Sequence, residues 1–215
     1  MVCLQTTLHY SHTITMVNEM KQKFIILFVL LFPFGACFAQ SGDSIYTLTA
    51  YGGFGYVRNI SSFNYELPGL NKNGLIGNLR IMWKPDYLLR AGIEVGRTDL
   101  YSVDQPDIQT DSGSTNLKTD VYSWTYMFVF SMSPLNNLDI NAGTGWGFNT
   151  VNNSSFGNES TSTEVGSVFM VSSAYYYPVS GNLKVGAEIR FMHLPKYDDQ
   201  IFTLQFSIAY IFLEY

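Results

Sequence analysis

Six ionisable side chains stand at alternate positions within otherwise apolar segments, and these residues carry most of the chemistry that the sequence offers. They are Arg80, Arg90, Glu94, Lys184, Glu188 and Arg190, with Asp139 and Gln205 close to them in parity. Arg90 and Glu94 would share one face of a strand, and so would Glu188 and Arg190, because strand side chains alternate. A buried charge is costly unless it is paired. If this face is buried, the set predicts a structural network of ion pairs. A gate or narrow polar path and a catalytic carboxylate pair are the alternatives.

Nucleophilic catalysis has little support in the sequence. His193 is the only histidine after residue 12, and no serine stands beside it in Phe191-Met192-His193-Leu194. Its parity groups it with Phe191 and Ile189 on an apolar face. A nucleophile needs its base within hydrogen-bond reach. We therefore predict that the protein is not an enzyme and has no catalytic residue.

Acidic stretches and glycine runs could suggest metal or phosphate binding. The acidic residues are Asp99, Asp104, Asp107, Asp111 and Asp120 in one stretch and Asp198 and Asp199 in another. Carboxylates bind Ca²⁺ or Mg²⁺, but this spacing matches no calcium loop. The runs Gly52-Gly53-x-Gly55 and Gly143-x-Gly145-x-Gly147 are followed by no helix, as a phosphate loop would require. We predict no metal and no cofactor, and we expect these glycines to relieve crowding within strands.

The elements that position these residues are strands. Eight segments show strand character, at about 45–57, 74–84, 87–100, 117–132, 138–150, 163–177, 182–194 and 200–213. In most of them, large apolar residues alternate with small, polar or charged residues, which is the strand period. The segment 163–177 is the least clear, because Val168 and Met170 interrupt the polar face.

The last segment shows which face points where. Phe202, Leu204, Phe206, Ile208, Tyr210 and Phe212 share one face, and Thr203, Gln205, Ser207 and Ala209 share the other. A large aromatic face opposite a small polar face suits a membrane barrel, with apolar residues outside and polar residues inside. Aromatic residues at both ends of the strands, such as Trp83, Tyr87, Tyr122 and Trp124, would form interfacial girdles. A soluble lipocalin-like barrel, with its apolar faces turned inward, is the alternative.

The connections between segments alternate in length. Short turns are expected at 84–86, 133–137 and 178–181, all with turn residues. Longer links are expected at Arg58–Asn73, Tyr101–Asn116 and Val151–Ser162, with a shorter one at Pro195–Asp199. Short turns at one end and long loops at the other are typical of outer-membrane barrels, whose turns face the periplasm. The sequence thus predicts an all-β, eight-stranded, antiparallel, up-and-down transmembrane β-barrel.

The N-terminal region looks like a targeting segment. Residues 20–39 combine a basic start at Lys21 and Lys23, an apolar run from Phe24 to Phe34, and small residues before Gln40. This pattern predicts a signal peptide cleaved after Ala39, with lipidation at Cys37 as the alternative. Residues 1–19 fit no part of it, and we interpret them as an upstream start assigned too early. The barrel domain is then 40–215.

Composition excludes several functional classes. Both cysteines precede Gln40, so a chain that starts there has no disulfide and no thiol chemistry. The net charge of −5 argues against nucleic acid as a partner.

The chain resembles the small eight-stranded outer-membrane β-barrel proteins, which are OmpA/OmpX-like, and in particular the uncharacterised porin-like barrel-domain proteins of Bacteroidetes. The resemblance is carried by Phe38-Ala39-Gln40, by Ile81 to Glu94 across the first turn, by Asn182 to Glu188, and by the C-terminal Phe212-Leu213-Glu214-Tyr215. It covers essentially all of 40–215. It implies a protein of the Gram-negative outer membrane that contacts lipid, lipopolysaccharide and the barrel insertion machinery, but it implies no activity.

Three functional hypotheses follow. The first is a monomeric structural or surface-interaction protein that contacts an unknown surface ligand through its long extracellular loops. The second is a narrow channel or small-molecule conduit through the polar interior. The third is a lipid A hydrolase that uses His193, because the resemblance extends to small barrels with a serine and a histidine near the outer rim.

Overall fold

The computed structural model describes residues 46–61, 68–85, 89–110, 113–155 and 158–215. The predicted signal peptide 20–39, the segment 1–19, the alternative lipidation site Cys37 and the predicted girdle residue Tyr87 lie outside the described residues. Among the described residues, no helix is long and apolar enough to span a membrane.

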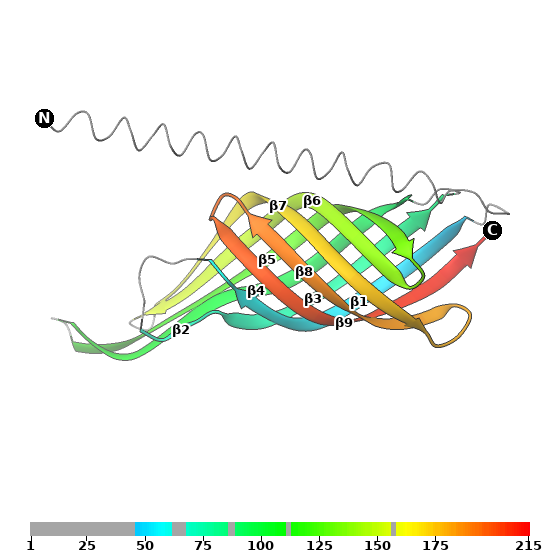
Figure 1. Ribbon diagram of the computed structural model, residues 1–215. Helices are drawn as coiled ribbons and strands as arrows, with labels where there is room; N and C mark the ends of the chain where they lie inside the picture. The colour runs from blue at the N-terminus through cyan, green and yellow to red at the C-terminus, as the bar shows by residue number, and fades with distance from the viewer. Residues whose placement is uncertain (1–45, 62–67, 86–88, 111–112, 156–157) are drawn as a thin grey trace, which may run out of the picture. The chain divides into compact units, whose positions relative to one another are not determined.

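The described chain is built from antiparallel strands (Figure 1). They are β1 (Thr47–Asn59), β2 (Leu70–Asn71), β3 (Asn73–Lys84), β4 (Leu89–Thr110), β5 (Gly113–Leu135), β6 (Leu138–Ser155), β7 (Asn158–Pro178), β8 (Leu183–Leu194) and β9 (Asp199–Glu214). Pairing runs in chain order from β3 to β9, and β1 pairs with both β3 and β9. The circuit of pairs is therefore complete, and each barrel strand has a partner on both sides.

The prediction of an all-β, up-and-down, eight-stranded barrel is confirmed. The additional strand β2 contributes only two residues, which pair with Val103 and Ser102 of β4 beyond the end of β3. It lengthens the sheet beside β4 and is not one of the eight strands that close the barrel.

The barrel has two different ends, which we name the turn end and the hairpin end. At the turn end, β5 and β6 are joined by two residues, and Asn137 takes a φ of 70°. At the hairpin end, β8 and β9 are joined by Pro195–Asp198, and Asp198 takes a φ of 54°. Asn and Asp tolerate this left-handed conformation better than other residues with side chains.

The prediction of long loops at the hairpin end is wrong for two of the links. Described parts of Tyr101–Asn116 and Val151–Ser162 are strand, because β4 continues to Thr110, β5 begins at Gly113, and β6 and β7 meet at Ser155 and Asn158. We call the four-stranded extension formed by residues 101–110, 113–121, 151–155 and 158–162 the rim sheet. Figure 1 shows it projecting at the left of the barrel.

Cross-strand polar pairs stabilise the rim sheet. Thr119 Oγ1 donates to Asn153 Oδ1 at 2.8 Å, and Thr161 Oγ1 donates to Asn152 Oδ1 at 3.0 Å. Both are pairs of residues that face each other in the register. Threonine favours strands, and such pairs each contribute up to about 1 kcal/mol. A composition rich in Ser, Thr and Asn predicts a loop, but here it forms a paired sheet.

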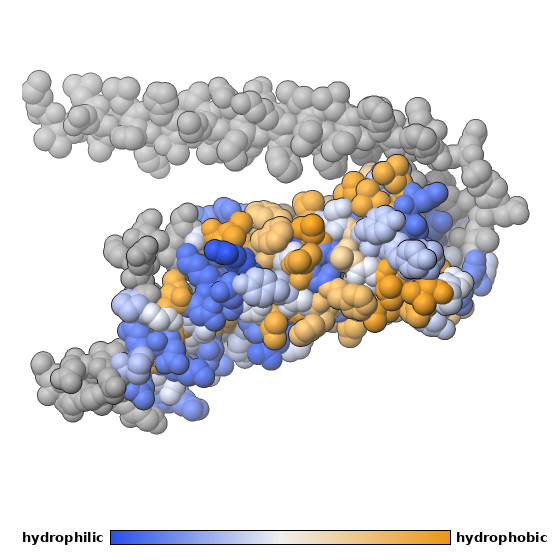
Figure 2. Space-filling view, turned by 60° about the horizontal axis from the view of Figure 1, so that its bottom comes forward, coloured by the Kyte–Doolittle hydropathy of each residue, from blue (hydrophilic) through white to orange (hydrophobic). Residues whose placement is uncertain are grey.

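The outside of the barrel is apolar and the inside is polar. Phe54, Leu79, Phe128, Phe206 and Tyr210 are each at least half exposed. Arg80, Glu94, Glu188 and Arg190 are buried at 3% exposure or less. Figure 2 shows the apolar surface over the turn-end part of the barrel and a hydrophilic surface toward the rim sheet. This distribution contradicts the lipocalin-like alternative, which requires the apolar faces inside.

The glycine run in β6 lies where strands approach closely. A Cβ on Gly145 would lie 1.9 Å from the carbonyl oxygen of Tyr126 on β5. Even an alanine would therefore force the two strands apart. The run relieves crowding, as the sequence suggests.

We predict that the outer part of the rim sheet can be removed without unfolding the barrel. Replacing 106–116 by Asn-Gly would join Gln105 to Leu117, which already face each other across β4 and β5, through a hairpin turn. The circuit of barrel pairs does not include the removed residues. The free energy of unfolding in urea, measured in detergent micelles, should change by less than about 1 kcal/mol. A variant that no longer folds would show that the rim sheet is part of the barrel's folding unit.

Candidate functional site

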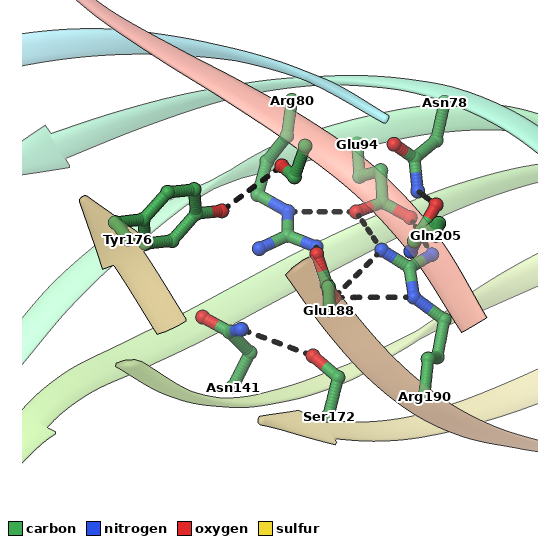
Figure 3. Close-up of polar contacts among 10 residues, drawn as sticks. Asn78, Arg80, Glu94, Asn141, Ser172, Tyr176, Glu188, Arg190 and Gln205 are labelled. Atoms are coloured by element: carbon green, nitrogen blue, oxygen red, sulfur yellow. Dashed lines mark hydrogen bonds and ion pairs between the residues drawn. The ribbon is translucent and has the colours of Figure 1, made fainter. Parts of the chain in front are cut away.

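Four charged side chains meet in the middle of the lumen (Figure 3). Arg80 Nε lies 2.7 Å from Glu94 Oε2, and Arg80 Nη2 lies 3.1 Å from Glu188 Oε1. Arg190 Nη1 lies 2.5 Å from Glu94 Oε1, and Arg190 Nη2 lies 3.0 Å from Glu188 Oε1. Each guanidinium therefore bridges both carboxylates. We call these four residues the central cluster; its formal charge is zero.

The central cluster spans the lumen. Arg80 and Glu94 face each other in the register of β3 and β4, whereas Glu188 and Arg190 lie two residues apart on β8, four strands around the circuit from β4. Strands that are distant in the circuit are thus tied together through their side chains. Planar guanidinium groups suit this task, because their fixed fork of donors matches carboxylate geometry.

Amide and hydroxyl side chains extend the polar contacts around the central cluster. Asn78 Nδ2 donates to Gln205 Oε1 at 3.3 Å, and Asn141 Nδ2 donates to Ser172 Oγ at 3.0 Å. Figure 3 shows both pairs beside the four charges. All four amide and hydroxyl residues are buried, so their hydrogen bonds replace those that water would otherwise make.

Arg90 belongs to a second group of side chains, nearer the turn end. Its Nη2 lies 2.5 Å from Asp139 Oδ1 and donates to Ser133 Oγ at 2.6 Å. Its Nη1 donates to Tyr51 Oη at 2.9 Å, and the Tyr51 ring packs edge-on against Tyr176, with centroids 5.7 Å apart. The sequence parity of Asp139 pointed to this neighbourhood. Nothing in the sequence indicated Tyr51 or Ser133 as partners.

Lys184 is not brought into either group. It is half-buried near the start of β8, where it pairs with Pro178 of β7 and Ala209 of β9 in the register. No ion pair of Lys184 is found within the described ranges. The six predicted residues thus divide into a central cluster of four, one member of the turn-end group, and one residue apart.

An apolar layer lies between the central cluster and the hairpin end. Its members are buried at 6% exposure or less: Val57, Ile76, Leu100, Val121, Val168, Met192, Leu194 and Ile201. On β8, Met192 and Leu194 follow Arg190 toward the hairpin end, and on β4 Leu100 follows Glu94 in the same direction. All eight side chains belong to one contiguous cluster. Buried polar side chains lie at the same level, because Thr203 faces Val57 and Thr98 faces Ile76 in the register.

Asp199 organises the mouth of the barrel at the hairpin end. Its Oδ1 accepts hydrogen bonds at 3.2 Å from Asn59 Nδ2 and from Ser61 Oγ. These contacts join the start of β9 to the end of β1. Asp199 is the first residue of β9 and is only 4% exposed.

Among the described residues, His193 contacts a backbone oxygen and not a nucleophilic side chain. Its Nδ1 lies 3.2 Å from the backbone oxygen of Asp199, and it faces Phe169 and Gln200 in the register. Within the described part of the chain, His193 makes no hydrogen bond to a serine. Among those same residues, no group of three or more His, Cys, Asp or Glu side chains is arranged to hold a metal ion.

No protein-family model and no curated protein matches the chain. Solved structures with a similar chain fold include outer-membrane proteins. Ail of Yersinia pestis is 15% identical, with 80% of this chain and 100% of that chain covered and a TM-score of 0.44. The Neisserial surface protein A is 14% identical, with 80% and 100% covered and a TM-score of 0.46. A major outer membrane protein from Thermus thermophilus is 10% identical, with 78% and 99% covered and a TM-score of 0.49. At these levels the comparison concerns the fold alone.

We predict that Glu94→Gln strongly destabilises the barrel. The change leaves two buried guanidinium groups facing one carboxylate, and breaking a buried ion pair from one side costs about 3–5 kcal/mol. The measurement is the free energy of unfolding in urea, in detergent micelles. Asp120→Asn is the matched control, because the Lys118–Asp120 pair at 3.6 Å is about half exposed and should contribute less than about 1 kcal/mol. Equal effects of the two substitutions would contradict a structural role for the central cluster.

Proposed function

We propose that the protein is a monomeric β-barrel of the outer membrane of a Gram-negative bacterium, and that its barrel anchors a surface-interaction element. The observation that carries the proposal is the apolar exterior around a charged, filled lumen. Lipid tails can cover exposed side chains such as Leu79 and Phe206, whereas water cannot do so without cost. The other neighbours in the membrane would be lipopolysaccharide and, during assembly, the barrel insertion machinery.

The orientation follows from the two ends. In outer-membrane barrels the short turns face the periplasm and the longer connections face outward. The first and last described residues lie at the turn end, where Tyr46 N donates to Tyr215 O at 2.9 Å and Tyr215 N donates to Tyr46 O at 3.1 Å. A secreted chain that inserts from the periplasm would keep both ends there. The rim sheet then stands on the outer surface.

The rim sheet is the part of the molecule suited to contact with a surface ligand. It is a paired sheet held by Thr–Asn hydrogen bonds, so it presents a defined surface. The resemblance to barrel proteins of Bacteroidetes would place the protein in that group of bacteria, and it forms part of the same proposal.

Neither the conduit nor the enzyme is favoured by a specific contact. Val57, Val168 and Ile201, at 0% exposure, fill part of the route that ions or small polar molecules would take. His193 lacks the nucleophile that a lipid A hydrolase requires. A non-enzymatic, non-conducting anchor is the function that the geometry supports best.

We predict that the protein fractionates with the outer membrane and migrates faster on gels when it is not boiled, because a closed barrel resists unfolding by detergent. The unheated sample of the purified protein should shift to its full apparent mass after boiling. A protein recovered in the soluble periplasmic fraction, with no shift on heating, would overturn the proposal.

We predict that the protein gives no discrete conductance steps in planar lipid bilayers, because its lumen is filled. The sample should be protein that shows the heat-dependent gel shift, so that an absence of current cannot be due to misfolded protein. Stepwise currents that change with Arg190→Gln would establish the conduit instead.

A further inference from the structure

A cavity of about 190 Å³ opens at the mouth of the barrel, above the apolar layer. Its lining residues are Leu100, Tyr101, Val121, Asn149, Val151, Ser162, Glu164, Tyr197 and Asp199. They come from two sources: β4 to β7 at the base of the rim sheet, and the β8–β9 turn with the start of β9. The floor is apolar, and the polar groups stand around it.

Asn149 is the unusual residue of this cavity. It is only 4% exposed, and its side chain interacts with the hydroxyl group of Tyr197, although neither Oδ1 nor Nδ2 has a hydrogen-bond partner of good geometry within the described residues. Asn149 faces Ser123 of β5 and Glu164 of β7 in the register, and its amide is one of the polar groups that line the cavity.

Hydrogen bonds and an ion pair with β7 hold the β8–β9 turn beside the cavity. Tyr197 Oη donates to Glu164 Oε2 at 2.8 Å, and Lys196 Nζ lies 3.1 Å from the same oxygen. Lys196 also donates to the carbonyl of Val165 at 3.2 Å. These contacts hold the Tyr197 ring as one wall, and the hydrogen bond from Tyr197 is the main cause that lowers the pKa of Glu164.

The charges of the cavity discriminate against anions. Glu164 and Asp199 are the ionisable carboxyl groups of the lining, and Lys196 balances only Glu164. A sulfate, phosphate or carboxylate group placed here would face an uncompensated negative charge. The occupant is expected to be neutral or positively charged.

We propose that this cavity binds one neutral or amino-substituted sugar ring. A sugar ring has apolar C–H faces that pack on tyrosine rings and on an apolar floor, and its hydroxyl groups donate to carboxylates and exchange hydrogen bonds with an amide. Tyr101, Tyr197, Asn149 and the two carboxyl groups provide these contacts together. The proposal deepens the surface-interaction role and rests on it for the outward orientation of the mouth.

The volume limits the ligand to one ring. An enclosed apolar cavity of about 150 Å³ accommodates benzene, so about 190 Å³ suits a single ring and not two. The ring would be free, or it would be the terminal unit of a glycan that continues into solvent through the open side.

The test uses the purified full chain in detergent micelles and a panel of galactose, glucose, N-acetylglucosamine, glucosamine and N-acetylglucosamine 6-sulfate. Saturation-transfer NMR and calorimetric titration should detect a neutral or amino sugar with a Kd of about 1 mM, a weak affinity of about −4 kcal/mol. Asn149→Leu should raise that Kd at least tenfold, because it removes the amide. Asn136→Leu, an exposed change in the β5–β6 turn at the other end of the barrel, is the matched control and should leave Kd within about twofold.

A second variant protects the test against misfolding. Tyr197 is 36% exposed, so Tyr197→Leu should fold and should also raise Kd at least tenfold. Each variant is checked by the heat-dependent gel shift before titration. Absence of binding by every sugar, equal binding by Asn149→Leu, or equal binding of the 6-sulfate would overturn the proposal. In the first case the cavity holds water only.

The source of the sugar is decided in lipid nanodiscs. If lipopolysaccharide in the nanodisc competes with the free sugar for the wild type, the ligand is a glycan of the same membrane. If it does not compete, the ligand is a glycan from outside, and both results support the site. Binding in micelles does not depend on membrane location, so a negative titration with a positive fractionation result separates failure of this inference from failure of the proposed function.

Discussion

The structure depends on one constraint: charged side chains stand inside a barrel whose outside is apolar, and they must neutralise one another. Arg80, Glu94, Glu188 and Arg190 do so as two positive and two negative groups, each guanidinium bridging both carboxylates. The arrangement also specifies the register. A slip of one residue between β3 and β4 would turn Arg80 or Glu94 outward among the exposed apolar residues, where a charge has no partner. The central cluster is therefore a strong determinant of strand pairing.

The remaining features of the lumen follow from the same need to fill a narrow interior. Eight strands leave room only for side chains, and these are distributed by height. A polar group around Arg90 lies near the turn end, the central cluster lies in the middle, and an apolar layer lies toward the hairpin end. The apolar layer lies between the central cluster and the cavity at the mouth.

The hairpin end differs from the rest of the barrel because strands β4 to β7 continue there beyond the part whose outer surface is apolar. In the rim sheet, polar pairs such as Thr119 with Asn153 replace the aromatic contacts found in the rest of the barrel. The β8–β9 turn closes over the base of this sheet through Tyr197 and Glu164. A cavity with a desolvated amide at Asn149 remains between them. The hairpin end therefore combines a paired sheet with a polar cavity.

The sequence by itself determined the strand period, the number of barrel strands and the inside and outside faces, because alternation in segments such as 200–213 depends only on local parity. It did not resolve 163–177, where Val168 and Met170 lie inside the lumen while Phe169 and Val171 lie outside, since the interior there is apolar as well. It also missed that the rim sheet is paired, because a segment rich in Ser, Thr and Asn lacks a regular apolar alternation. Only the tertiary structure decided which charges meet. Partners across a lumen, such as Arg190 with Glu94, Arg90 with Asp139, or Tyr197 with Glu164, depend on closure and register between distant strands, and no local pattern encodes that relation.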